Sequence, residues 1–237
     1  MKVEIWSDYA CPFCYIGKRR FETALQQFTN SDQVEVIYRS FELDPNAPKD
    51  MDEDMSTMLS KKYGMSIEQA KANGKQVEQQ AASVGLEYHL DKTILTNTLQ
   101  AHRLTHYAAS QGKEAEVVEA LYKAYFTDSL HLSEPTVLAE IAKQAGLDYD
   151  ATLEMLKGDQ YTNEVRADER DAANLGVRGV PFFVIDRKYG VSGAQPSEMF
   201  LEAMNKAWNE AHPITVMNTD NAGGGVCTDG ACSIDGK

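Results

Sequence analysis

The order of apolar and polar positions predicts that the chain begins and ends as parts of one mixed sheet. Two alternating, strand-like runs near the start are separated by an amphipathic helical run, a strand–helix–strand unit whose length favours parallel strands. Near the other end, two short apolar runs flank a polar turn, which predicts an antiparallel hairpin, and a helix follows. The strands are expected over 2–8, 33–41, 180–185 and 189–193, and the helices over 12–28 and 195–208.

Between these parts, the chain is expected to be helical throughout from about residue 50 to residue 176. A turn-rich segment over 44–48 separates it from the first unit, and caps and glycines divide it into several helices. Ser66 and Gln69 have the spacing of a capping box, which predicts that a helix begins there.

Four cysteines occur as two close pairs, and the first pair is the motif Cys11-Pro12-Phe13-Cys14. The motif stands where the first predicted strand passes into the first predicted helix, the setting of a thioredoxin-like redox motif. Free backbone N–H groups and the helix dipole favour an anion there, so Cys11 is the expected thiolate nucleophile. Pro12 suits the first helical position because it has no N–H to satisfy. Cys14, one turn later, is the expected resolving thiol, more buried than Cys11.

The element order β-α-β, helices, β-β-α predicts an α/β protein with a thioredoxin-like fold and a large all-helical insertion domain. A glycine-rich linker near the C-terminal end precedes the second cysteine pair, Cys227 and Cys232. The expected domains are a discontinuous thioredoxin-like domain over 1–45 and 165–212, a helical insertion over 46–164, and a flexible tail over 213–237.

Charge and hydropathy exclude some partners. The net charge of −13, with no basic cluster, argues against nucleic acid, and no apolar run has the length of a membrane span. The sequence opens directly on a predicted strand, which leaves no room for a signal peptide and predicts a cytoplasmic protein. Close cysteine pairs in a reducing compartment indicate catalysis or redox sensing more than structural disulfides.

Four segments of the sequence carry a family resemblance: SDYACPFCYIG at 7–17, NTLQAHR at 97–103, VRGVPFFV at 177–184 and VSGAQP at 191–196. Together they resemble the DsbA family of thiol–disulfide oxidoreductases, and more narrowly its FrnE-like, cytoplasmic branch. The resemblance extends over about residues 1–212, and the terminal pair also looks like a second motif of some FrnE-like members.

The resemblance implies a site as well as a fold. Pro181 is expected to be a cis-proline lying against the cysteines, and Val180 to present its backbone to an extended substrate strand, with Pro12 and Phe13 beside it. Substrates would be protein or small-molecule thiols and disulfides. No cofactor is expected beyond the redox-active disulfide, and glutathione stays open as a co-substrate. Cys227 and Cys232 are either a second redox pair that exchanges electrons with the first or a tail that takes no part.

Two departures from related proteins bear on the chemistry. Thioredoxin-like proteins often carry a buried carboxylate six residues before the first cysteine, where this chain has Ile5; Asp8 and Glu4 are the substitute candidates. Strong oxidants of the DsbA type carry a histidine between the cysteines, where this chain has Phe13. Without that histidine, the reduced cysteine pair is expected to be less stabilised than in the strong oxidants, which predicts a more reducing redox potential.

Other interpretations stay open beside this one. His102, Arg103 and His106 share a helix face that either binds an acidic group at the site or makes helix–helix hydrogen bonds. A glutathione-dependent isomerase or a kappa-type glutathione transferase is the first rival function, although such enzymes usually lack an intact pair. A protein that binds metal through four thiolates is the second. The chain is expected to be a monomer or a homodimer.

Overall fold

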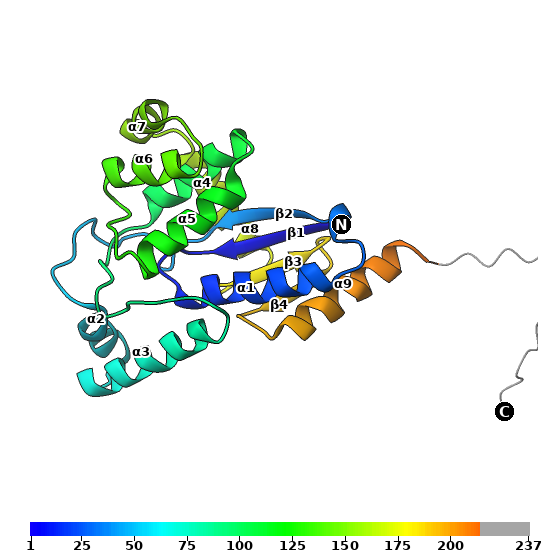
Figure 1. Cartoon of the computed structure of the whole chain (residues 1–237), viewed down its shortest axis with the longest axis horizontal. Coiled ribbons are helices and arrows are strands. Elements are labelled where there is room, and N and C mark those ends of the chain that lie inside the picture. Colours follow the sequence, from blue (N-terminus) through cyan, green and yellow to red (C-terminus); the bar gives the residue numbers. More distant parts are fainter. Residues whose placement is uncertain (214–237) are drawn as a thin grey trace, which may run out of the picture.

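The structure of the protein, a computed structural model, describes residues 1–213. A four-stranded mixed sheet has helices on both of its faces, and further helices lie beside it (Figure 1). The strands are β1 (Lys2–Ser7), β2 (Glu35–Ser40), β3 (Phe182–Ile185) and β4 (Tyr189–Ser192). The helices are α1 (Pro12–Gln27), α2 (Met55–Tyr63), α3 (Ile67–Ala82), α4 (Leu99–Ser110), α5 (Glu114–Phe126), α6 (Pro135–Gln144), α7 (Tyr149–Lys157), α8 (Thr162–Asn174) and α9 (Ser197–Ala211), with a short 3₁₀ turn, η1, over Ser31–Gln33.

The sheet has the strand order β2-β1-β3-β4, which places β1 beside β3, a strand that begins at residue 182. Strand β1 pairs in parallel with β2, as expected for strands joined by a helical crossover. It pairs antiparallel with β3, and β3 and β4 form the predicted antiparallel hairpin. The predicted α/β fold class is therefore confirmed.

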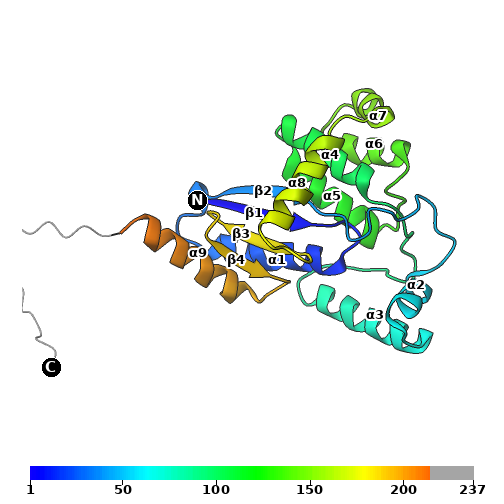
Figure 2. The same ribbon diagram turned by 180° about the vertical axis from the view of Figure 1, so that it is seen from behind.

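Side chains of β1 pack into two different layers, one on each face of the sheet. Val3 and Ile5 belong to the large core that also contains buried residues of α1 and α9. Trp6 points to the opposite face, where it packs with Val184 and with Ala172 of α8. In Figure 2, α8 lies in front of the sheet, and α1 and α9 lie behind the strands. Helix α8 therefore covers the face opposite to the one that α1 and α9 cover. Because both faces of β1 are covered, its end near Ser7 holds the start of α1 in a fixed place.

The expectation that residues 50–176 are helical throughout is wrong at two places. Residues 50–54 and 83–98 contain no helix. After α3, Leu86, Tyr88 and Leu90 are buried while the residues between them are not, which is the period of extended chain. The N–H of His89 donates to the carbonyl of Phe126 at 2.7 Å, so this extended segment runs against the end of α5.

Other local predictions agree with the structure. The N–H of Gln69 donates to Oγ of Ser66 at 3.1 Å, and the N–H of Ser66 donates to Oε1 of Gln69 at 2.9 Å, so the capping box is confirmed. None of the helices described within residues 1–213 is both long and apolar enough to span a membrane. The second cysteine pair, Cys227 and Cys232, lies outside the described residues, and the predicted domain boundaries stay a prediction.

Candidate active site

The first cysteine pair opens α1, where the sequence predicted it. Cys11 is the N-cap residue and Pro12 the first helical residue. The N–H of Cys14 donates to the carbonyl of Cys11 at 3.0 Å, which starts the first turn. Both side chains are free thiols, and Cys11 is 5% exposed against 2% for Cys14. Both residues are thus buried, and Cys11 is slightly the more exposed of the two.

The loop before β3 lies directly against this pair. The Val180–Pro181 peptide bond is cis, and Sγ of Cys11 lies 3.5 Å from the carbonyl oxygen of Val180, to which it donates. The carbonyl of Pro181 accepts from the N–H of Gly193 at 2.8 Å, so the residue that follows β4 holds the loop in place. The structure therefore brings Cys11 and Val180 together from opposite ends of the chain.

Gly17 allows α1 to approach this loop. A Cβ atom on Gly17 would stand 3.0 Å from Cγ of Pro181 and 3.4 Å from Cζ of Phe183. We expect Gly17→Ala to destabilise the protein by about 1–2 kcal/mol, because crowding costs more than the gain in helix propensity. Urea denaturation measures this change in the free energy of unfolding.

Gly74 in α3 is the matched control, since α3 has the same length as α1. A Cβ there would meet nothing closer than Cδ1 of Leu90 at 4.0 Å. Gly74→Ala should therefore stabilise the protein by up to about 1 kcal/mol. A Gly17→Ala variant that is stabilised to the same extent would contradict close packing between α1 and the loop.

Cys14 lies in an enclosed, aromatic environment. Burial raises the pKa of its thiol well above the ordinary value, and the neighbouring Cys11 raises it further. The rings of Tyr9 and Tyr15 pack on Tyr122 of α5, with centroids 4.9 Å and 5.0 Å away. Cys14 is therefore a protonated thiol at neutral pH and has to lose that proton before it can attack a disulfide.

The structure distinguishes between Asp8 and Glu4, the two candidates to replace the carboxylate that related proteins carry at the position of Ile5. Asp8 adjoins the cysteines, because its carbonyl accepts from the N–H of Cys11 at 3.1 Å. Its backbone N–H also lies close enough to Cys14 to lower the pKa of that thiol, an effect that burial outweighs. Glu4 lies on the face of the sheet that α8 covers and pairs there with Arg39 and Arg187. Asp8 is thus the acidic residue whose backbone contacts the cysteine pair, and its charge also raises the pKa of the Cys14 thiol.

The helix face with His102, Arg103 and His106 is divided among three neighbours. Nε2 of His102 lies 3.5 Å from Oδ1 of Asp8, beside the cysteine pair. Arg103 donates to carbonyl groups at the end of α7, and Nε2 of His106 lies 3.0 Å from Oδ2 of Asp168 on α8. Arg103 and His106 thus make contacts between helices, as the second of the two interpretations expected.

Tyr88 is a residue at the site that sequence reasoning missed. Its hydroxyl donates to the carbonyl of Pro12 at 2.8 Å, and its ring stacks on Tyr15, with centroids 6.1 Å apart. The signal was available, because residues 86–90 alternate in the manner of extended chain. Reading this segment as part of a helix concealed it.

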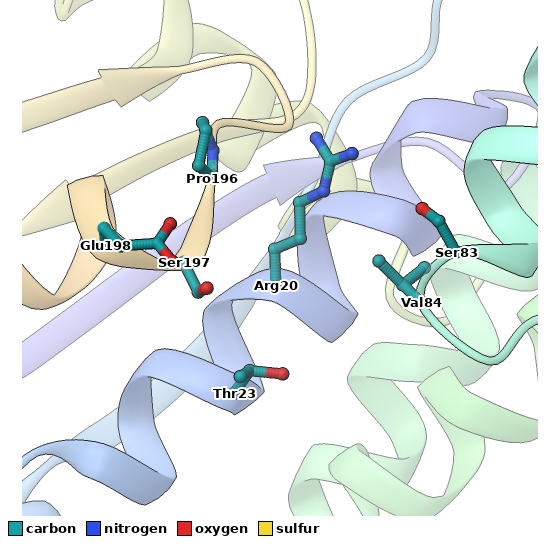
Figure 3. Close-up of a pocket in the computed structure, with 7 residues that line it drawn as sticks. All are labelled: Arg20, Thr23, Ser83, Val84, Pro196, Ser197 and Glu198. Carbon is teal, nitrogen blue, oxygen red and sulfur yellow. The ribbon is translucent and has the colours of Figure 1, made fainter.

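Two surface hollows lie near α1. One, of about 420 Å³, includes Val180 and Pro181 in its lining. The other, of about 360 Å³, lies between α1, the segment after α3 and the start of α9, and Arg20 stands within it (Figure 3). Arg20 donates there to the carbonyl of Ala194, and no cysteine lines the hollow. The first hollow has no cysteine in its lining either, but it includes Val180, whose carbonyl accepts from Sγ of Cys11.

A possible metal-ligand group within residues 1–213 consists of Asp50, His131 and Glu134 and includes no cysteine. Nε2 of His131 lies 3.2 Å from Oδ1 of Asp50, and the N–H of Ser133 donates to Nδ1 of His131 at 3.3 Å. Both ring nitrogens thus have protein partners. The four-thiolate interpretation requires Cys227 and Cys232, which the described residues do not include.

Together the sheet order, the cysteine pair at the start of α1 and the cis-proline opposite it define a thioredoxin-like protein with inserted helices. Comparison with known sequences gives the family. The sequence model of the DSBA-like thioredoxin domain matches residues 2–205, and the chain belongs to that family.

Similar proteins include one solved structure that matches throughout. A probable DsbA oxidoreductase from Streptomyces coelicolor is 45% identical, with each chain covered completely and a TM-score of 0.86. The uncharacterised protein YwbO of Bacillus subtilis is 26% identical, over 86% of this chain and 95% of its own length. The cytosolic disulfide reductase DsbM from Pseudomonas aeruginosa, solved with GSH, is 15% identical and has a TM-score of 0.61, over 87% of this chain and 100% of its own. At that identity, DsbM shows the fold alone.

Proposed function

We propose that the protein is a thiol–disulfide oxidoreductase that acts by exchange at Cys11-Pro12-Phe13-Cys14. The observation that carries this proposal is the position of Cys11 at the start of α1, with Sγ 3.5 Å from the carbonyl of Val180 and Cys14 buried behind it. The helix N-terminus favours the thiolate form of a cysteine, which is the reactive form. The intact pair favours this function over that of a glutathione-dependent isomerase or a kappa-type transferase, enzymes that usually lack one.

Each direction of exchange uses both sulfurs. In reduction, the Cys11 thiolate attacks a substrate disulfide, one substrate thiolate leaves, and a mixed disulfide forms. Cys14 then loses its proton and attacks Sγ of Cys11, which releases the second substrate thiolate and leaves the Cys11–Cys14 disulfide. In oxidation, a substrate thiolate attacks that disulfide, and the same steps run in reverse.

Extended segments are the form of substrate that this site favours. Among residues 1–213, the backbone N–H of Val180 donates to no other group, so a substrate strand has a donor to pair with. The ring of Phe13 is 38% exposed between the cysteines and offers apolar contact. Pro12, Val180 and Pro181 complete the proposed contact surface, and the hollow of about 420 Å³ lies beside it.

The direction of electron flow proposed for this site is towards the substrate. Phe13 supplies no positive charge to stabilise a reduced pair, which favours a reducing potential over that of a strong oxidant. A cytoplasmic location and glutathione as the recycling thiol stay predictions of the sequence. Membership of the FrnE-like branch stays a prediction.

Catalysis in glutathione buffer tests the proposal. Three substrates separate the activities: a peptide with two thiols for oxidation, its disulfide form for reduction, and a protein with mispaired disulfides for isomerisation. We expect the wild type to accelerate reduction most, relative to a Cys11→Ser/Cys14→Ser double variant. If the wild type and the double variant give equal rates with all three substrates, the proposed function is wrong.

A further inference from the structure

Arg178 stands without a protein partner on the loop that carries the cis-proline. Within residues 1–213, its guanidinium makes no hydrogen bond, ion pair or contact with an aromatic ring, and the residue is exposed. A partner would be expected, because the chain has 36 Asp and Glu residues against 23 Lys and Arg. Most of the other arginines bond to described residues: Arg19, Arg20, Arg39, Arg103, Arg166 and Arg187. Arg178 therefore keeps its donors for a ligand.

The side chain of Arg178 lines the hollow of about 420 Å³ beside the reactive pair. It is the one charged residue among those that line the hollow, and the others are three glycines, one serine and the apolar run 180–182. The hollow beside α9 differs, because it contains Glu198 as well as Arg20, and Arg20 donates to the carbonyl of Ala194 (Figure 3). A cation in a hollow that holds no acid favours an anionic ligand.

The fold holds the backbone of this loop at both ends. Val177 is 5% exposed and packs with Trp6, and its N–H donates to the carbonyl of Ala172 at 2.9 Å. At the other end, the carbonyl of Pro181 accepts from the N–H of Gly193 at 2.8 Å. The backbone at residue 178 is thus fixed before a ligand arrives, which lowers the entropic cost of binding.

Arg178 lies within reach of a substrate that reacts at Cys11. The carbonyl oxygen of Val180 is 3.5 Å from Sγ of Cys11. Arg178 is two residues before Val180, so the two Cα atoms are at most about 7 Å apart. The length of an arginine side chain adds to this reach. A group that binds Arg178 is therefore within about two residues of a substrate sulfur that contacts Cys11.

We propose that Arg178 selects thiols and disulfides that carry a carboxylate within about two residues of the reacting sulfur. This selection rests on the proposed function and names its substrate class. The planar guanidinium matches the two oxygens of a carboxylate. The backbone N–H groups of Gly179 and Val180 donate to no group within residues 1–213 and provide further donors beside it.

The net charge of the protein opposes this selection, which makes it measurable. A charge of −13 by itself repels acidic substrates and attracts basic ones. A preference for acidic substrates thus requires a local cation at the site. Arg178 takes no part in the bond changes, so its contribution is to binding and to the rate of productive encounter.

Three small disulfides of similar length and different charge test the selection: dithiodipropionate is acidic, bis(2-hydroxyethyl) disulfide is neutral and cystamine is basic. Each is mixed with the reduced protein, which carries Cys227→Ser and Cys232→Ser. One disulfide and the two thiols of Cys11 and Cys14 give the Cys11–Cys14 disulfide and two small thiols. Acid quenching, alkylation of the remaining thiols and mass spectrometry give the second-order rate constant for each disulfide.

The ratio of the acidic to the neutral rate constant is compared between variants, so that the intrinsic reactivity of each disulfide cancels. We expect Arg178→Gln to lower this ratio by about three- to tenfold and to raise the ratio of the basic to the neutral rate constant. Arg178→Lys should keep part of the preference, because it keeps the charge but loses the planar fork. The difference between wild type and Arg178→Gln should shrink as NaCl rises from about 0.05 M to about 0.5 M.

Arg170→Gln is the matched control. It removes the same charge from an exposed arginine of α8 that does not line the hollow. Asp168 and Ala172, two residues to either side, are the buried positions of this helix, so Arg170 lies on the side that faces away from the sheet. Its ratio of acidic to neutral rate constants should equal that of the wild type.

The outcomes distinguish the selection from the function. If Arg178→Gln keeps the wild-type ratio, the selection is wrong. An equal shift in Arg170→Gln would assign the effect to the overall charge, and equal slowing with all three disulfides would show that Arg178 only supports the loop; both would overturn the selection. In these cases exchange still proceeds and the proposed function stands. A reduced protein that loses no thiol with any of the three disulfides would refute the function, and the selection with it.

Discussion

Replacing Cys11 with serine is expected to lower exchange activity by about a thousandfold or more, whatever the substrate. Cys11 is the slightly more exposed residue of the pair and lies beside the carbonyl of Val180, so it is the proposed nucleophile. Serine keeps the shape of the side chain but is a far weaker nucleophile at neutral pH. Initial rates of disulfide reduction in glutathione buffer measure the loss.

The Cys14→Ser variant should complete the first step of exchange but not the second. The Cys11 thiolate still attacks, but no second thiol resolves the product, so one equivalent of substrate accumulates as a mixed disulfide that mass spectrometry detects. The control is Cys227→Ser/Cys232→Ser, which leaves the first pair unchanged. If the Cys11→Ser variant kept its activity and this control lost it, the second pair, and not the pair at the start of α1, would be the reaction centre.

Glu4→Ala is expected to destabilise the protein by about 2–3 kcal/mol. The Glu4 side chain is 2% exposed and pairs with Arg39 and Arg187 across the back of the sheet. Breaking a buried ion pair costs about 3–5 kcal/mol, and the smaller value follows because both arginine side chains reach water. Glu35→Ala is the matched control on the neighbouring strand, where an exposed pair with Lys2 contributes about 0–1 kcal/mol.

The effect of Glu4 also depends on pH in a definite direction. Burial raises the pKa of Glu4, but Arg187 and Arg39 lower it by more, so the folded-state pKa lies below the ordinary value of 4.5. Its contribution to stability is therefore complete above about pH 4.5 and is lost as the pH falls through the folded-state pKa. Urea denaturation over this pH range should show the wild type and Glu4→Ala converging in acid. A difference that stays constant would contradict the ion-pair account.

Local signals carried most of what the sequence predicted correctly. Alternation in β1, the proline at the first position of α1 and the capping box at Ser66 each depend on a few neighbouring residues. The position of Cys11 was predicted correctly because the local signals of β1 and of α1 follow each other directly in the sequence. The approach of Val180 to Cys11 came instead from the family resemblance, because 169 residues separate them in the chain.

What the sequence did not show depends on packing between distant segments. Asp8 and Glu4 both stand in or directly after the first strand, and only the sheet shows that Glu4 turns to α8 while Asp8 adjoins the cysteines. His102 and Arg103 are consecutive, yet Arg103 donates to the end of α7 and His102 faces Asp8.

The redox equilibrium of the Cys11–Cys14 pair against glutathione is the most direct test of the central claim. We predict a reversible two-electron transition that the Cys11→Ser/Cys14→Ser variant lacks and that proceeds without bound metal. Its midpoint should be more negative than the value of about −120 mV typical of a strong DsbA-type oxidant. A protein whose thiols show no reversible transition at any ratio of glutathione to its disulfide, and that holds zinc stoichiometrically instead, would contradict the exchange mechanism.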